Sequence, residues 1–352
     1  MKILGLAADH PERKVSNRDV LRIVQQKSEE EFQGDLPATL MEVEKTLDNS
    51  GIQNRYWFEE DEPWYPLMKK TMDRALEQSG LSKDDIDLVI YSSVFRRVLE
   101  PGMSTLIASA YGLHKAECFD VIEACAGWLR GMHVAQNFIK GGAYKNIMIL
   151  NAEAGVHEGE YGFETFGIKS PEDLEWSYSS LTLGEAVAAT VVSAGGEDLS
   201  FSWRSFPQFA TLCSLGLPDT TPAGNVLGDI DLGSGNSKKF KCHAREMNAV
   251  GFKRCYRYIT ETKSEWSKAD VIVSHSHSKI AGERIYEKAG NDRPIICAYQ
   301  NYGNVASCSF PVSYMHGRKI GIIQPQSTVF FMIAAAGLSM GAVSLNFDKG
   351  FI

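Results

Sequence analysis

The 352-residue sequence contains no apolar run long enough to span a membrane as a helix. The longest candidate, residues 329–340, falls short of the roughly 20 residues that a spanning helix needs. The first residues carry too short an apolar run for a signal peptide before charge appears. We therefore expect a soluble, cytoplasmic protein with no membrane partner.

The sequence also lacks a cysteine spacing that is typical of disulfide-bonded or redox-active proteins. The seven cysteines form no CxxC pair and are odd in number, which does not suit a disulfide framework. They stand at positions 118, 125, 213, 242, 255, 297 and 308. A reducing, cytoplasmic compartment fits this usage best.

Positively charged residues are outnumbered: the sequence has 36 Lys and Arg against 44 Asp and Glu, which gives a formal net charge of −8. Nucleic-acid binding needs a basic field, so nucleic acid is not expected as the main partner. Any attraction to an anionic carrier must come from a local patch. The length and the 44% hydrophobic content allow a large core, as one big domain or as two similar halves.

The stretch Asp120–Trp128 predicts a short strand that leads into Cys125 and then into a helix. The apolar residues that follow recur at helical spacing, at positions 129, 132, 135, 138 and 139. A thiol at a helix start feels the positive end of the dipole and nearby backbone N–H groups, which lowers its pKa and favours the thiolate. Cys125 is therefore a candidate nucleophile, although a buried structural cysteine is the alternative.

A nucleophilic cysteine needs a base and an oxyanion donor, which are usually remote in sequence. Residues 271–275 predict a buried strand that ends in His275, where a histidine is well placed for chemistry. Asn304 follows Gly303 and precedes small residues that suit a tightly packed helix start. Its amide can donate an N–H to an oxyanion.

Together these segments resemble the cysteine, histidine, asparagine and glycine motifs of ketoacyl-ACP synthase III enzymes of the thiolase superfamily. The similarity runs in order from about Gly51 to the end and includes the glycine segment 336–341 and the stretches 141–153 and 183–189. It implies an α/β fold in which two similar mixed βαβαβ halves form a five-layered αβαβα arrangement. We place the halves at 1–195 and 196–352, since Gly195-Gly196 marks the passage between them, and read the polar, broken residues 155–180 as a cap insertion.

The resemblance also implies a two-stage activity and a homodimer. Cys125 takes an acyl group from an acyl-CoA or acyl carrier protein thioester, while the backbone N–H groups of Cys125 and Gly337 hold the oxyanion. His275 and Asn304 then bind a second thioester for a Claisen condensation, as in fatty acid or polyketide biosynthesis. No permanently bound cofactor and no metal are expected.

Glu100, before Pro101, departs from the usual synthase III pattern, in which an apolar residue reaches into the partner subunit's acyl pocket. An acidic residue after an arginine-rich turn resembles the subgroup that joins two acyl chains head to head in bacterial olefin biosynthesis. There the glutamate acts as a base. A surface glutamate is the alternative interpretation.

The family's usual tryptophan and arginine for the nucleotide end of coenzyme A are missing, with Lys45 and Asn49 near those positions. A helix expected over 247–262 carries Lys253, Arg254 and Arg257, which are candidates to bind a carrier or coenzyme A. Solvated helix charges are the alternative.

The sequence also contains several weaker patterns. His275 and His277 form an H-x-H pair that can bind zinc, but no third ligand follows at suitable spacing. Without zinc, His277 is expected as a pocket or packing residue, or as the catalytic histidine in place of His275. Residues 276–279 match S-x-x-K by chance, because the companion motifs are absent. Residues 213–238 are rich in Gly, Pro, Asp and Asn and are expected as loop, and within them 233–238 lack the full phosphate-loop spacing. Two other functions stay open: a synthase III-like acyltransferase that makes an ester or amide in secondary metabolism, and a non-catalytic partner subunit.

Overall fold

The structure is a computed structural model that describes residues 1–160, 162–216, 226–227, 230–231, 240–275 and 278–347. Two five-stranded mixed sheets form its frame. The first has the order β1 (Lys2–Asp9), β7 (Ala186–Ser193), β6 (Asn146–Glu153), β4 (Leu88–Tyr91) and β5 (Glu117–Asp120). The second has the order β8 (Phe201–Ser205), β16 (Ser339–Asn346), β15 (Thr328–Ala335), β13 (Val271–Ser274) and β14 (Ile295–Ile296).

The two sheets share one pairing pattern. In the first, β4 pairs parallel with β5 and β6, and β7 then pairs antiparallel with β6 and β1. In the second, β13 pairs parallel with β14 and β15, and β16 then pairs antiparallel with β15 and β8. The repeated pattern is the architecture expected of two similar halves; the exact division at 195/196 stays a prediction.

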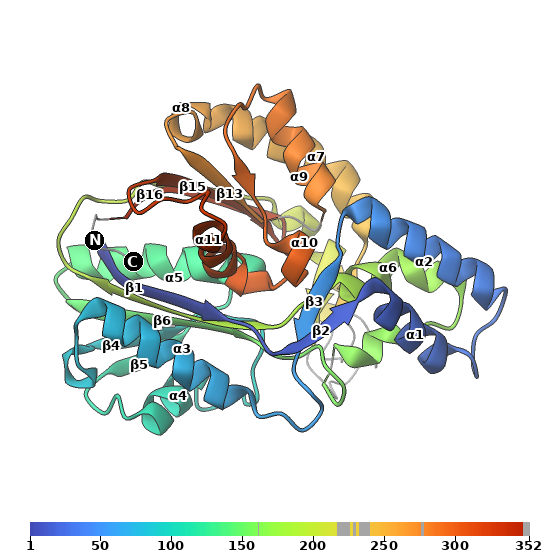
Figure 1. Cartoon of the computed structure of the whole chain (residues 1–352), viewed down its shortest axis with the longest axis horizontal. Coiled ribbons are helices and arrows are strands. Elements are labelled where there is room, and N and C mark those ends of the chain that lie inside the picture. The colour runs from blue at the N-terminus through green and yellow to red at the C-terminus, as the bar shows by residue number, and fades with distance from the viewer. Residues whose placement is uncertain (161, 217–225, 228–229, 232–239, 276–277, 348–352) are drawn as a thin grey trace.

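Helices lie between the sheets and on both outer faces (Figure 1). The middle layer consists of α5 (Gly127–Lys140) and α11 (Ser309–Lys319), whose Trp128 and Phe310 stack in the core that joins the sheets. On the outside, α3 (Trp64–Ser79) and α4 (Met103–Tyr111) pack on the first sheet. The second sheet is covered by α7 (Ala244–Glu261), α8 (Lys263–Trp266) and α9 (Lys279–Lys288).

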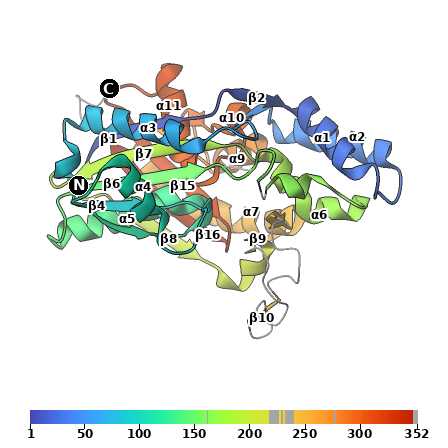
Figure 2. The ribbon, with the colours of Figure 1, turned by 90° about the horizontal axis from the view of Figure 1, so that it is seen from below.

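A separate group of helices and a hairpin lies at one end of the sheets, as both ribbon views show (Figures 1 and 2). It contains α1 (Asn17–Ser28), α2 (Leu36–Ser50), α6 (Leu174–Ser177) and the hairpin of β2 (Arg13–Ser16) and β3 (Asn54–Trp57). These elements share a core with residues 155–160 and 162–180, which form short helical turns. The remaining elements are β9 (Cys213–Leu215), β10 (Val226–Leu227), β11 (Ile230–Asp231), β12 (Phe240–Cys242) and α10 (Tyr299–Tyr302).

Local sequence signals account for the ends of two helices. Ser16 caps α1 in a capping box with Asp19, in which the Ser16 N–H donates to the Asp19 carboxylate and the Ser16 hydroxyl accepts from the Asp19 N–H. Gly80 ends α3 in the left-handed conformation with φ +68°, which a side chain would strain. Hydrogen-bonded ends of this kind leave fewer unpaired backbone groups, so these boundaries are readable from sequence.

Other expectations need correction. The strand before the nucleophile is Glu117–Asp120, so Asp120 is its last residue and not its first. The expected loop 213–238 contains the short strands β9, β10 and β11 among its described residues, while 217–225, 228–229 and 232–238 lie outside them. No helix in the described part of the chain is long and apolar enough to span a bilayer.

Candidate active site

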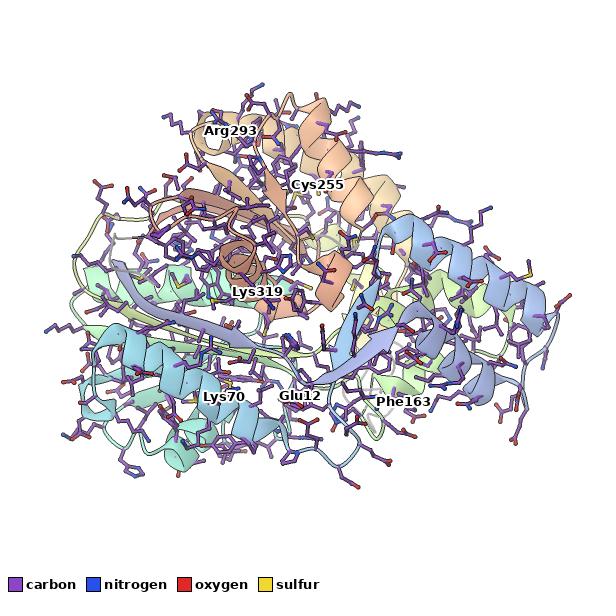
Figure 3. All side chains as sticks on the ribbon, viewed as in Figure 1. Glu12, Lys70, Phe163, Cys255, Arg293 and Lys319 are labelled. Atoms are coloured by element: carbon purple, nitrogen blue, oxygen red, sulfur yellow. The ribbon has the colours of Figure 1, made fainter. Side chains whose placement is uncertain are left out.

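One cavity brings together the residues that the sequence singles out. Its lining includes Cys125, His275 and Asn304, which come from three separate segments of the chain. The other walls come from α7, α9, the end of β15 and the strands β9 and β12; Cys255 of α7, labelled in Figure 3, is among them. Most of these wall residues are apolar, and the cavity measures about 150 Å³. The cavity therefore suits an apolar ligand beside a thiol.

Cys125 lies in a 3₁₀ turn, Ala124–Ala126, between β5 and α5. Ala124 has a φ of +46°, a strained conformation for a residue with a Cβ. Gly127, the first residue of α5, lies so close to β4's end that a Cβ there would be 2.4 Å from the Ser92 carbonyl oxygen. The Ser92 hydroxyl also donates to the Gly127 carbonyl at 2.8 Å. These contacts hold the Cys125 thiol just before the N-terminal end of α5.

The expected low pKa of Cys125 is wrong. Burial raises the pKa of its thiol to about 12, and the nearby Glu153 carboxylate adds to the rise, followed by Cys242. Only the backbone N–H of Cys125 acts in the opposite direction. Desolvation and a like charge therefore outweigh the helix start, and the resting nucleophile is a neutral thiol.

Glu153, at the end of β6, is the acidic group that influences this thiol. It is 8% exposed and accepts a hydrogen bond from the Ser307 hydroxyl at 2.5 Å; Ser307 in turn contacts the Ser93 hydroxyl at 2.9 Å. Burial raises the pKa of Glu153 to about 7, against the hydrogen bonds from Ser307 and the backbone that lower it. A carboxyl group that changes charge near neutral pH thus lies close to the nucleophile.

His275 follows β13 directly, as expected. Its Nδ1 lies 2.8 Å from the hydroxyl oxygen of Ser309, which also lies 2.7 Å from the Ala306 carbonyl oxygen. The single hydroxyl hydrogen can serve only one of these two acceptors. If it goes to Ala306, then His275 Nδ1 carries the proton and Nε2 is a base; if it goes to His275, then Nε2–H is a donor. The orientation of the Ser309 hydroxyl hydrogen is therefore coupled to the tautomer of His275.

Asn304 is held in a turn that is locked to the segment 182–184. Its backbone N–H donates to the Thr182 carbonyl at 2.8 Å, and its carbonyl accepts from the Gly184 N–H at 3.0 Å. A Cβ on Gly184 would lie 2.0 Å from the Tyr302 carbonyl oxygen, so only glycine fits there. The side-chain oxygen of Asn304 accepts from the Ala306 N–H at 3.0 Å. That contact orients the amide and leaves its NH₂ group as the donor for a ligand.

Backbone strain gathers at this site. In the described part of the chain three non-glycine residues have positive φ: Ala124 (+46°), Ala306 (+40°) and Leu338 (+49°). Each lies within two residues of a predicted site residue, namely Cys125, Asn304 and Gly337 respectively. Gly337 itself has φ +76°, and its neighbours Ala336 and Leu338 line the cavity. Strain of this kind typically persists where a functional geometry depends on it.

Glu100 lies outside the cavity of its own chain and is exposed, on the loop between β4 and α4. The loop is fastened on both sides. Arg97 pairs with the mostly buried Glu160 at 2.5 Å, and the Asp120 carboxylate accepts from the Met103 N–H at 2.9 Å. The proposed entry of Glu100 into a partner subunit's pocket stays a prediction.

The cations of α7 do not line the cavity. Lys253 and Arg257 are exposed, and Arg257 pairs with Glu261 at 2.9 Å. Arg254 lies over the rings of Phe206 and Phe209, with 4.5 Å to the latter. Lys45 and Asn49, on α2, are exposed as well, and a carrier or coenzyme A role for any of these residues stays a prediction.

Four residues near the site escaped the sequence analysis: Glu153, Ser309, Cys213 and Cys242. No local pattern marks them, because their roles come from contacts between distant segments; the acidic end of a buried strand at Glu153 was the only available signal. His277 and the S-x-x-K and 233–238 patterns fall wholly or partly outside the described residues. Within the described residues no three His, Cys, Asp or Glu side chains gather as metal ligands.

Comparison with known proteins places this geometry in context. The profile of the family described as 3-oxoacyl-[acyl-carrier-protein] synthase III matches residues 119–161, the segment that holds Cys125. Beta-ketoacyl-[acyl-carrier-protein] synthase III 1 of Bacillus cereus is 24% identical over 99% of both chains. The corresponding enzyme of Listeria monocytogenes is also 24% identical, over 88% of this chain and 95% of its own.

Solved structures agree with these sequence matches. A crystal structure of Xanthomonas campestris OleA with bound lauric acid and lauroyl-CoA superposes with a TM-score of 0.79 at 18% identity, covering 98% of both chains. The 3-oxoacyl-[acyl-carrier-protein] synthase III of Aquifex aeolicus gives a TM-score of 0.72 at 18% identity, over 98% of this chain and 99% of that one. These likenesses confirm the predicted thiolase-like fold class. The chain is thus similar in sequence to 3-oxoacyl-[acyl-carrier-protein] synthase III enzymes and shares the fold of these solved structures.

Proposed function

We propose that this protein is an acyltransferase of the condensing type, which loads an acyl group on Cys125 and joins it to a second thioester. The observation that carries the proposal is that Cys125, His275 and Asn304 line one cavity whose other lining residues are mostly apolar. The similarity to enzymes named for 3-oxoacyl synthesis on acyl carrier protein supports acyl-CoA or acyl-carrier-protein thioesters as substrates.

In the first stage the Cys125 sulfur attacks the thioester carbonyl and the substrate's own thiol leaves. Because burial holds the Cys125 pKa near 12, its proton must be removed as the attack occurs. His275 lines the same cavity and can accept that proton in the tautomer whose Nδ1–H donates to Ser309. The backbone N–H groups of Cys125 and Gly337 are proposed to hold the oxyanion.

In the second stage the α-carbon of another thioester attacks the acyl-cysteine. A carbon–carbon bond forms, the bond from the acyl carbon to sulfur breaks, and the Cys125 thiolate is released. The developing enolate needs hydrogen-bond donors, which the Asn304 NH₂ group and the His275 Nε2–H can supply. The shared hydroxyl hydrogen of Ser309 allows His275 to be a base in the first stage and a donor in the second.

The carbanion arises either from decarboxylation of a malonyl group or from removal of an α-proton by Glu100 of a second subunit. A homodimer is supported by the edge position of β5 and by exposed apolar side chains near it. Leu99 is 67% exposed and Ile122 is 62% exposed, and both flank the loop or strand end that would meet a partner. Such a dimer would carry Glu100 toward the neighbouring subunit.

Intact-protein mass spectrometry with a panel of acyl-CoA and acyl-carrier-protein thioesters tests the proposal. Wild-type protein should gain the mass of one acyl group, and Cys125→Ala should gain none. Cys118→Ala is the matched control, because Cys118 is a partly buried cysteine of β5 outside the cavity and should not affect labelling. Labelling that persists in Cys125→Ala would refute the assignment of the nucleophile.

Product analysis separates condensation from transfer to an alcohol or amine. A condensing enzyme yields a new carbon–carbon bond with release of thiol, and of carbon dioxide when a malonyl donor is used. An acyltransferase yields an ester or an amide. Formation of only the latter products would overturn the condensing role while leaving Cys125 acylation intact.

A further inference from the structure

A second pair of thiols borders the cavity beside Cys125. Cys213 of β9 and Cys242 of β12 both line the cavity, and they stand directly opposite each other in the antiparallel pair of these strands. The two strands are separated in sequence by a long segment, so the pairing is a feature of the fold and not of local spacing.

The register places these two cysteines at a position that suits a disulfide. The His243 N–H donates to the Leu212 carbonyl at 2.9 Å, which makes 212 and 243 a hydrogen-bonded pair. The next pair along, Cys213 and Cys242, is therefore a non-hydrogen-bonded pair, in which the Cα atoms are about 4.5 Å apart and the side chains are closest. Disulfides span Cα separations of roughly 4.4–6.8 Å, so no backbone movement is needed.

The chemistry of the pair is uneven. A side-chain hydrogen bond from Cys213 lowers the pKa of Cys242, with a further contribution from Ser179, while the same contact raises the pKa of Cys213. Cys242 is thus the nucleophilic member and Cys213 the proton-bearing neighbour. The arrangement matches that of a reactive thiol beside a resolving thiol.

We propose that Cys213 and Cys242 form a reversible disulfide at the cavity wall when the protein meets a peroxide. The Cys242 sulfur attacks one peroxide oxygen, the O–O bond breaks, and a sulfenic acid and water form. The Cys213 sulfur then displaces the hydroxyl as a second water, so two thiols and hydrogen peroxide give one disulfide and two waters. A thiol reductant returns the pair to its starting state.

The disulfide has a direct consequence for the nucleophile. Cys242 is one of the groups that raise the pKa of Cys125, and a sulfur held in a disulfide no longer carries charge. Oxidation therefore removes a repulsive neighbour and converts two separate cavity-wall thiols into one rigid link. The Cys213–Cys242 pair is thus a redox-sensitive part of the cavity lining beside Cys125. Its reversible disulfide agrees with a reducing compartment, in which disulfides are transient.

Peptide mapping after treatment of the whole protein with hydrogen peroxide tests this inference. We expect one linked peptide pair, Cys213 with Cys242, loss of two thiols, and full recovery with dithiothreitol. Cys255→Ala is the matched control, because Cys255 lines the same cavity but lies on a helix without an opposing cysteine; it should form the disulfide as wild type does.

Two single variants keep the inference falsifiable. Cys242→Ser should slow peroxide-dependent thiol loss by about tenfold or more. Cys213→Ser should form no linked peptide pair, and in excess hydrogen peroxide its Cys242 sulfenic acid should consume further peroxide to give sulfinic and sulfonic acids that dithiothreitol does not reverse. A disulfide between Cys125 and Cys242, or oxidation of Cys255 as fast as Cys242, would overturn the proposal. None of these readouts uses acyl transfer, so the result is independent of the proposed function.

Discussion

Replacing Glu153 with glutamine should change how the stability of the protein depends on pH. The pKa of Glu153 is raised from its ordinary 4.5 to about 7, chiefly by burial. Between these values the unfolded chain has lost the proton that the folded chain still holds. Stability is then fully present below pH 4.5 and falls as the pH rises through 7.

The magnitude follows from the displacement of the pKa. The rise from 4.5 to about 7 corresponds to about 3 kcal/mol of unfolding free energy lost across that window. For a chain of 352 residues this corresponds to about 4 °C in Tm. Glutamine keeps an oxygen that accepts from the Ser307 hydroxyl but carries no charge, so the variant should lose this pH-dependent decline.

Thermal unfolding of both proteins from pH 5 to pH 8 provides the assay. As the pH rises and Glu153 ionises, the Tm of the wild type should fall by about 4 °C more than the Tm of Glu153→Gln. Glu44→Gln is the control, because Glu44 is exposed on α2 and should give a curve parallel to wild type. Parallel curves for Glu153→Gln and wild type would refute the reasoning about this carboxyl.

The remaining predictions concern the two stages of the reaction. Asn304→Ala should acylate at Cys125 yet lose condensation by on the order of a hundredfold, measured as product formed per acyl-enzyme. His275→Ala should lose condensation to a similar extent and also acylate more slowly, because it lacks the proton acceptor of the first stage. Near-normal condensation in either variant would remove that residue from the second stage. Ser309→Ala should lower condensation by about tenfold and shift its pH profile, because the His275 tautomer loses its partner. Glu100→Gln should leave acylation intact and abolish non-decarboxylative condensation; a Glu100 that only faces solvent would leave both steps unchanged.

Much of the frame was predictable because it depends on local signals. The capping box at Ser16 and the left-handed Gly80 mark helix ends by contacts within a few residues, and long apolar runs such as β6 and β7 mark buried strands. The strand pairing was not predictable in this way. It joins β1 to β7 and β8 to β16 across large sequence separations, and the family resemblance implied the two mixed halves but not these pairings.

The candidate site was predictable only where motif and geometry coincide. Cys125, His275 and Asn304 follow or precede recognisable strand and turn signals, and the fold gathers them. Ser309 and Glu153 lack such signals, since their significance arises from hydrogen bonds to His275 and Ser307. The strain at Ala124 was equally hidden, because alanine at a positive φ looks ordinary in a sequence.

The pKa of Cys125 shows why a local rule can give the wrong sign at an active site. A helix start stabilises a thiolate by a modest amount, typically below about 2 kcal/mol. Enclosure between two sheets removes water from the thiol, and Glu153 adds a negative charge; together they raise its pKa to about 12. The local effect belongs to a few residues before α5, whereas the opposing effects come from β6 and from the cavity walls. A resting thiol that stays neutral reacts only when a bound thioester lies beside it with His275 available as the proton acceptor, which suits an enzyme whose acyl intermediate must wait for a second substrate.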